Sequence, residues 1–162
     1  MDNLKNYAKA AKDIDRFEIV ADGAAAEIAS RLRQEIIRSR GSFCCVTNSE
    51  EFAHIGMMYR SPKKWGEIFI VLKSDPSFNR TKDTLYGVLA QGRTVLVFSD
   101  ASKEELTAFR LRDGSDVKSV YKPDGQQQGI NKAAANLDRL FVCSIGSLDD
   151  INAIDAAAAL AV

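Results

Sequence analysis

Six polar residues follow the apolar runs of the chain, and their side chains are of the types that bind phosphate and sugar oxygens. In open α/β sheets, ligands bind beyond the carboxyl ends of the strands, which is where these residues fall if the apolar runs are strands. The six candidate ligand-binding residues are Thr47, Asn48, Ser74, Asp75, Asp100 and Ser147. The same residue types also cap helices and start turns, so the pattern leaves a purely structural role open.

Asp100 is the carboxylate of most interest because it ends an apolar run. The end of a buried strand is the usual place for a carboxylate that binds a metal, a ribose hydroxyl or a phosphate. A phosphoacceptor aspartate needs further acidic partners and a paired lysine, and none stands at a recognisable spacing. The alternative is a turn residue at the entry to a helix.

A second pattern is basic and aromatic, and it precedes the second apolar run. Arg60, Lys63, Lys64 and Trp65, with Tyr59 beside them, are residue types that hold a nucleic-acid backbone and stack a base. The alternative is a solvated turn with its aromatic rings partly packed. The chain has 22 Lys and Arg against 22 Asp and Glu, and this zero net charge makes nucleic acid the less favoured partner.

Strong catalytic motifs are missing from the sequence, which contains neither a P-loop nor a GxGxxG, HExxH or GxSxG pattern. The single histidine, His54, excludes a histidine-rich metal centre, and no metal site is predicted. The three cysteines lack metal-binding spacing and are interpreted as reduced, buried thiols. The sequence therefore predicts no particular cofactor and leaves open whether the protein is an enzyme.

The candidate residues must be positioned by short strands and the helices between them. Four continuous apolar runs predict strands buried on both faces, at 43–46, 68–72, 94–98 and 140–145, and a short strand is expected at 16–20. Helices are expected at 2–13, 23–39, 81–91, 103–110, 131–138 and 148–160. Asp22 is expected to cap the helix at 23–39, and Ser102 with Glu105 forms a capping-box pattern. The alternation predicts a three-layer α/β fold with a mainly parallel sheet of four to five strands and helices on both faces.

Two segments resist assignment from the sequence. Residues 51–60 are compatible with a helix or with a hairpin strand. Residues 116–121 alternate in a way that is typical of an antiparallel edge strand.

Residues 66–100 resemble the middle of nucleoside deoxyribosyltransferase-like domains in their order of strand, loop, helix and strand. Ala90, Gly92, Arg93 and the run 94–98 match the end of that unit. The catalytic glutamate of the family would fall at Thr84, or one position away at Asp83. Because that glutamate is missing, the resemblance implies binding of a nucleotide-like ligand rather than a reaction at a glycosidic bond.

Length and composition predict one α/β domain over residues 1–162. The start of the chain lacks a secretory signal and no run is long enough to span a membrane, so a cytoplasmic protein without a membrane partner is expected. The apolar segment 151–162 either docks on the sheet or makes a homo-oligomer contact through the C-terminal helix.

For function, the sequence favours a domain that binds a small nucleotide- or nucleoside-like ligand at the strand carboxyl ends. The alternative is a non-catalytic protein-interaction or inhibitory module, whose partner would be a protein. A third hypothesis is a nucleic-acid-binding accessory protein that uses the basic cluster.

Overall fold

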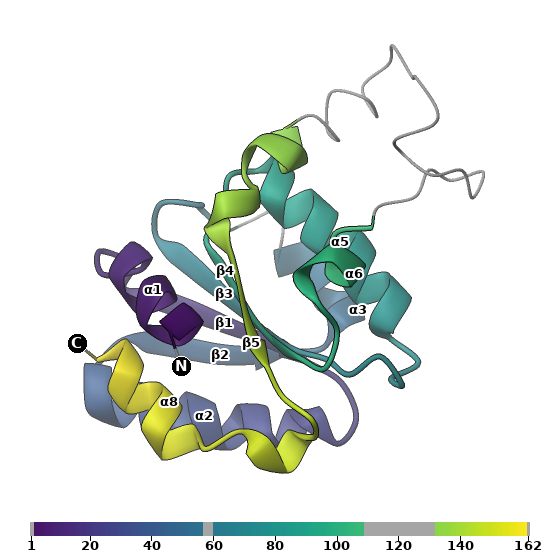
Figure 1. Ribbon diagram of the computed structural model, residues 1–162. Helices are drawn as coiled ribbons and strands as arrows, with labels where there is room; N and C mark the ends of the chain where they lie inside the picture. The colour runs from purple at the N-terminus through teal and green to yellow at the C-terminus, as the bar shows by residue number, and fades with distance from the viewer. Residues whose placement is uncertain (1, 57–59, 109–131, 162) are drawn as a thin grey trace.

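The computed structural model describes residues 2–56, 60–108 and 132–161, and they fold around a five-stranded parallel sheet. The strand order is β2-β1-β3-β4-β5 (Figure 1). In register, Glu18 of β1 lies between Cys45 of β2 and Glu67 of β3. The strands are β1 (Arg16–Ala21), β2 (Phe43–Thr47), β3 (Trp65–Ile70), β4 (Val95–Ser99) and β5 (Leu140–Ser144).

Helices cover both faces of the sheet (Figure 1). One face carries α1 (Asp2–Ala10), α2 (Ala25–Arg40) and α8 (Ala153–Leu160). The other carries α3 (Ser49–Glu51), which continues into a π-helical turn at Phe52–Gly56, together with α5 (Phe78–Ala90) and α6 (Lys103–Leu106). Short 3₁₀ turns at Leu137–Arg139 and Leu148–Asp150 flank β5.

Two apolar cores result, one on each side of the sheet. Successive strand residues point to opposite faces, so Ile19 packs toward α2 and α8 while its neighbour Val20 packs toward α5. Both residues are buried. This two-sided burial explains why the strands read as continuous apolar runs rather than as alternating ones.

The predicted fold class is confirmed by the parallel sheet and its two helical layers. Residues 49–56 are helical, which answers the question left open for most of the segment 51–60. The capping box of Ser102 and Glu105 is present at the start of α6. The predicted edge strand at 116–121 lies outside the described residues.

Several expected boundaries differ in the structure, among them those of β3, which runs over 65–70 rather than 68–72, and two helix starts differ for a visible reason. Asp22 does not cap α2: the residue at the cap position is Ala24, and the Asp22 carboxylate accepts a hydrogen bond from the Ser49 backbone N–H instead. The helix expected at 148–160 is split into a 3₁₀ turn and α8, because Asn152 caps α8 by accepting from the Asp155 N–H. Among the described residues, no helix is both long enough and apolar enough to cross a membrane.

Candidate functional site

The strand order reverses direction between β1 and β3, and this reversal defines the candidate site. The chain leaves β1 through residues 22–24 into α2 on one face, and leaves β3 through residues 71–77 into α5 on the opposite face (Figure 1). In doubly wound sheets with this order, ligands bind at such a switch point, outside the carboxyl ends of the strands. The loops 22–24 and 71–77 therefore form the candidate ligand site.

Both helices that start at the switch point lack a side-chain cap. Neither Ala24 before α2 nor Ser77 before α5 accepts a hydrogen bond from the first turn of its helix. The N–H groups of Ala25, Ala26 and Phe78 donate to carbonyls of the preceding loops, but no side-chain acceptor neutralises the partial positive charge of either N-terminus, and this charge attracts an anion. Gly23 adopts a φ of 55°, and a Cβ built on it would meet nothing within 4 Å, so the space beside this loop is open.

The carboxylates at this edge hold the loops in place. Asp75 Oδ2 accepts from the Leu72 N–H at 2.8 Å, which closes the turn after β3. Asp100 Oδ1 accepts from the Lys73 N–H at 2.8 Å and so ties the loop after β4 to the loop after β3. In the same way, Asp22 ties the loop after β1 to the start of α3. These bonds tie the ends of β3 and β4 to each other, and the ends of β1 and β2 to each other.

The six residues predicted from the sequence lie at several places along this edge. Asn48 caps α3 by accepting from the Glu51 N–H, and Ser74 is exposed in the loop after β3. Thr47 donates instead to the buried Glu18 carboxylate, away from the edge. Ser147 follows β5, four strand spacings (about 19 Å) from the end of β2, so one small ligand cannot contact both ends of the set. The structure does bring Asp75 and Asp100 together around the Lys73 backbone, and contact of the six with a ligand remains a prediction.

The basic cluster predicted as a nucleic-acid surface lies at the opposite, amino edge of the sheet, where Trp65 begins β3. Trp65 is only 8% exposed, and the Arg60 guanidinium covers its ring at 4.4 Å. Arg60 also forms an ion pair with Glu18 at 3.5 Å. Of the cluster residues that the structure describes, only Lys63 and Lys64 are exposed, so the Trp65 ring is not available to stack a base; Tyr59 lies outside the described residues.

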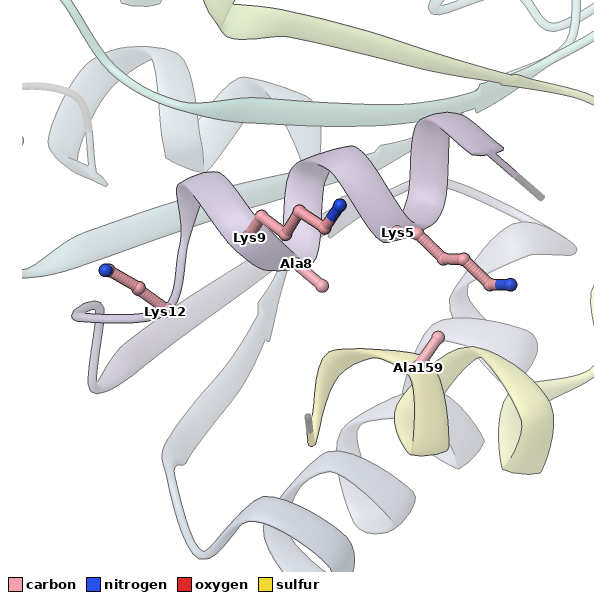
Figure 2. A pocket seen from close by; sticks show the side chains of 5 residues that line it. All are labelled: Lys5, Ala8, Lys9, Lys12 and Ala159. Carbon is pink, nitrogen blue, oxygen red and sulfur yellow. The ribbon is translucent and has the colours of Figure 1, made fainter.

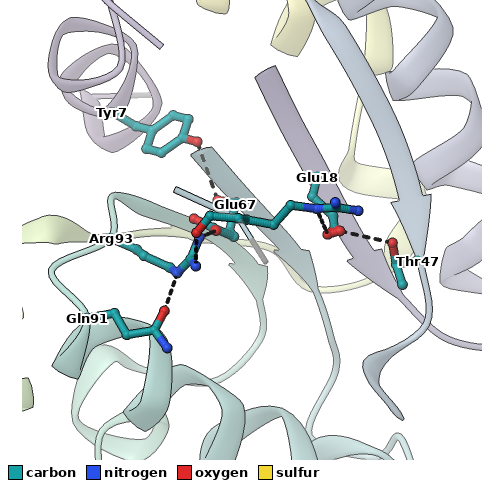
Figure 3. A network of polar contacts seen from close by, with 7 residues as sticks. Tyr7, Glu18, Thr47, Glu67, Gln91 and Arg93 are labelled. Atoms are coloured by element: carbon teal, nitrogen blue, oxygen red, sulfur yellow. Dashed lines mark hydrogen bonds and ion pairs between the residues drawn. The ribbon is translucent and has the colours of Figure 1, made fainter. Parts of the chain in front are cut away.

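A network of charged side chains crosses the middle of the sheet, and sequence analysis missed it (Figure 3). Glu18 and Glu67 are register neighbours on β1 and β3, and both are fully buried. Glu67 is bound by the guanidinium of Arg93, which is 1% exposed and which also donates to Gln91 Oε1 at 2.6 Å. Since no part of either glutamate reaches the surface, this network positions strands and does not contact a ligand.

Burial raises the pKa of the Glu67 carboxyl to about 7. The Arg93 guanidinium opposes that rise, while the negative charge of Glu18 adds to it. Glu67 Oε2 is buried and has no hydrogen-bond partner among the described residues, so the desolvation of the charged form is only partly offset.

A signal for the network was present in the sequence. Each of the two glutamates stands inside a strand among apolar residues, and a buried acid requires a cationic partner. The partner cannot be read from spacing, because Arg60 lies 42 positions from Glu18 and Arg93 lies 26 positions from Glu67.

Comparison with known proteins shows the fold. No protein-family model and no curated protein matches the chain. Among solved structures, the C-terminal domain of glucosamine-fructose-6-phosphate aminotransferase from Francisella tularensis matches with a TM-score of 0.61 and 13% identity, over 98% of this chain and 37% of that chain. The sugar isomerase domain of an RpiR transcription factor from Sphaerobacter thermophilus matches with a TM-score of 0.58 and 15% identity, over 98% of this chain and 74% of that one. The chain thus spans little more than a third of the length of the Francisella tularensis chain.

These matches correct the predicted function. The nucleotide- or nucleoside-like ligand is wrong, because the folds that this chain resembles come from proteins named for a sugar phosphate or a sugar isomerase. Polar groups at strand ends are of the types that bind phosphate and sugar oxygens; nucleotides and sugar phosphates carry both, so the position of these groups does not separate the two ligand classes. The resemblance of 66–100 to nucleoside deoxyribosyltransferase-like domains rests on the unit β3–α5–β4, which is generic to doubly wound sheets.

Proposed function

We propose that this chain binds a small sugar phosphate at the carboxyl edge of its sheet, between the loop 22–24 after β1 and the loop 71–77 after β3. The sugar-phosphate class follows from the fold likeness to the domains described above. The place follows from the strand order, which puts the switch point between these two loops.

The observation that carries the proposal is the pair of uncapped helix N-termini at the switch point. Helices α2 and α5 leave opposite faces of the sheet, and neither first turn is occupied by a side-chain acceptor. A phosphate dianion seated there would accept from backbone N–H groups and be stabilised by the dipoles of both helices. Gly23 leaves room beside α2 for its oxygens.

The sugar would face the loop carboxylates. Asp100 uses Oδ1 to accept from the Lys73 N–H, and within the described residues no donor engages Oδ2. The exposed hydroxyl of Ser74 lies in the same loop system. These groups would accept from and donate to sugar hydroxyls, so a phosphorylated sugar is expected to bind more tightly than phosphate alone.

The first experiment is a thermal-shift panel of hexose 6-phosphates, the matching free hexoses and inorganic phosphate. A ligand at 100 times its Kd stabilises the folded state by about 2.7 kcal/mol, which for a domain of this size is a shift in Tm of roughly 5–11 °C. We expect a shift with at least one hexose phosphate and none with the free sugar. A panel in which no sugar phosphate raises Tm would contradict the proposal.

A substitution at the start of α2 tests the place of binding. Ala24 is exposed, so Ala24→Asp should fold while its carboxylate repels a phosphate from the N-terminus of α2. We expect affinity to fall at least tenfold by calorimetry. The matched control is Gln34→Glu, which adds the same charge to an exposed position in the middle of α2 and should leave affinity unchanged. Equal losses in both variants would place the ligand elsewhere.

Assembly through the C-terminal helix is a further part of the proposal. Ile154 of α8 is 59% exposed, which is unusual for a large apolar side chain and favours a contact between copies. We expect light scattering to report a dimer or larger oligomer that Ile154→Glu dissociates. A wild-type chain that stays monomeric at micromolar concentrations would rule this contact out.

A further inference from the structure

A groove on the face opposite α5 runs between α1 and α8 (Figure 2). Its volume is about 560 Å³, within the range of sites that hold a ligand or a peptide. Ala8 of α1 and Ala159 of α8 form its walls, and three lysines stand along it: Lys5, Lys9 and Lys12. None of these residues belongs to the candidate sugar-phosphate site or to the buried network.

Both walls of the groove are held by hydrogen bonds. The Asn3 side-chain amide at the start of α1 donates to the Val142 carbonyl of β5 at 2.7 Å. At the other end, the Arg40 guanidinium donates to the Ala11 carbonyl at 2.9 Å and to the Leu160 carbonyl of α8 at 2.7 Å. One arginine of α2 thus fastens the ends of α1 and α8 to each other, and the groove is preformed.

The three lysines are not neutralised by the chain itself. Within the described residues, none of them forms an ion pair. On the exposed face of α2, by contrast, Arg31 pairs with Glu27 and Arg38 pairs with Glu35. No carboxylate is among the described residues that line the groove, so its three lysines present positive charge that favours an anionic occupant.

The spacing of the charges indicates the shape of that anion. Lys5 and Lys9 lie about 6 Å apart along the axis of α1 at 1.5 Å per residue, and Lys12 lies in the turn beyond its end, so the charges form a row rather than converging on one point. A single small anion cannot contact all three ammonium groups, whereas a helix with acidic residues four and seven positions apart can. The small side chains of Ala8 and Ala159 permit close approach of a third helix between the two walls.

We propose that the α1/α8 groove docks an amphipathic, acidic helix of a partner protein, with its small apolar residues against Ala8 and Ala159 and its carboxylates on the lysine row. A membrane surface fits less well. The exposed bulky apolar residues of the described chain lie outside the groove, so the lysine row has no neighbouring anchor to insert into lipid. This proposal does not depend on the sugar-phosphate site.

The test uses the whole chain and a defined probe, a fluorescein-labelled alanine-based helical peptide of about 16 residues. The probe carries glutamate at i, i+4 and i+7 of one face, and two matched peptides carry glutamine or lysine there. We expect saturable binding of the glutamate peptide by anisotropy, at least tenfold tighter than the glutamine peptide, weakening as salt rises. No binding of the glutamate peptide, or binding equal to that of glutamine, would overturn the proposal.

Variants assign the binding to the groove. The triple variant Lys5→Gln, Lys9→Gln, Lys12→Gln should lose at least tenfold in affinity, and these exposed positions should tolerate glutamine without unfolding. The control removes three exposed lysines elsewhere, Lys63→Gln, Lys64→Gln and Lys132→Gln, and should bind as the wild type does. A charge-reversed variant with glutamate at the three groove positions should instead bind the lysine peptide.

Two further outcomes would overturn the proposal. If the control variant loses as much affinity as the groove variant, the peptide responds to overall charge and not to the groove. If vesicles containing anionic lipid bind the chain through the three lysines while the glutamate peptide does not, the groove is a membrane contact.

Discussion

The carboxyl edge of the sheet and its centre both hold acidic side chains, but the two regions use them differently. At the edge, Asp75 and Asp100 accept hydrogen bonds from backbone N–H groups of a loop and remain near solvent. At the centre, Glu18 and Glu67 are fully buried and each is matched to an arginine brought from another part of the chain.

This difference teaches that the role of a carboxylate follows from its surroundings rather than from its place in the sequence. The edge carboxylates keep solvent access and can exchange a loop contact for a ligand contact. The central ones have lost water on folding and depend on their arginines for compensation. Function is therefore expected at the edge, and stability at the centre.

The largest expected effect comes from breaking the central ion pair. Arg93→Met leaves the buried Glu67 carboxylate without its cation, which should lower the free energy of unfolding by about 3–5 kcal/mol at pH 8. Urea denaturation measures the loss. The exposed pair provides the control, because Arg31→Met should cost no more than about 0.5 kcal/mol. If the two variants lose similar free energy of unfolding, the buried ion pair stabilises the fold no more than the exposed one does.

A pH titration of stability sharpens the same contrast. The pKa of Glu67 is about 7 in the folded protein and lies near 4.5 ordinarily, so the folded state binds the proton more tightly than the unfolded state does. Glu67 therefore contributes its full share to the free energy of unfolding below pH 4.5. This contribution is lost as pH rises to 7, and the total loss is about 3 kcal/mol.

The Glu67→Gln variant has no titratable group at this position. The free energy of unfolding of the wild type should therefore fall relative to that of the variant as pH rises from 4.5 to 7. Urea midpoints at several pH values measure the difference. A difference that stays constant over that window would mean that the pKa of Glu67 is the same in the folded and unfolded states.

A smaller effect on stability than at the buried pair is expected at the carboxyl edge. Asp100→Ala removes the acceptor of the Lys73 N–H, and because this loop is solvated the cost should be about 1 kcal/mol. The free energy of sugar-phosphate binding should fall by more than the free energy of unfolding does. Calorimetry on the folded variant measures the loss in affinity. A variant that loses stability but binds as the wild type does would make Asp100 a loop residue only.

Local patterns predicted much of the fold. The continuous apolar runs predicted strands covered on both faces, and the structure confirms this because two cores sandwich the sheet. The capping box at Ser102 was predictable since both of its bonds form within four residues. The polar residues that follow the strands stand at the carboxyl edge because parallel strands end on the same side, except that the Thr47 hydroxyl donates to Glu18; contact of these residues with a ligand stays a prediction.

Long-range pairing was beyond the reach of such patterns. Asp22 appeared to be a local cap, yet it binds Ser49, 27 positions away. Gly56 gave no interpretable signal either. A Cβ there would lie 2.9 Å from Glu18 Oε1 and 2.6 Å from the Phe52 ring, so the glycine is required by a contact that only the folded chain contains. Residues that act together across the sheet share no sequence spacing that would reveal them.

The strand order β2-β1-β3-β4-β5 also bears on how a growing chain assembles. The second strand to be synthesised pairs with the first, and each later strand adds to a free edge of the sheet. No strand pair that has already formed must therefore separate for a later strand to be inserted. Chains emerge at about 5–20 residues per second, which allows this outward growth to accompany synthesis. A nascent chain that ends after β3 already contains Glu67 but not Arg93. The three-strand intermediate must therefore keep that carboxyl protonated or hydrated until its arginine emerges.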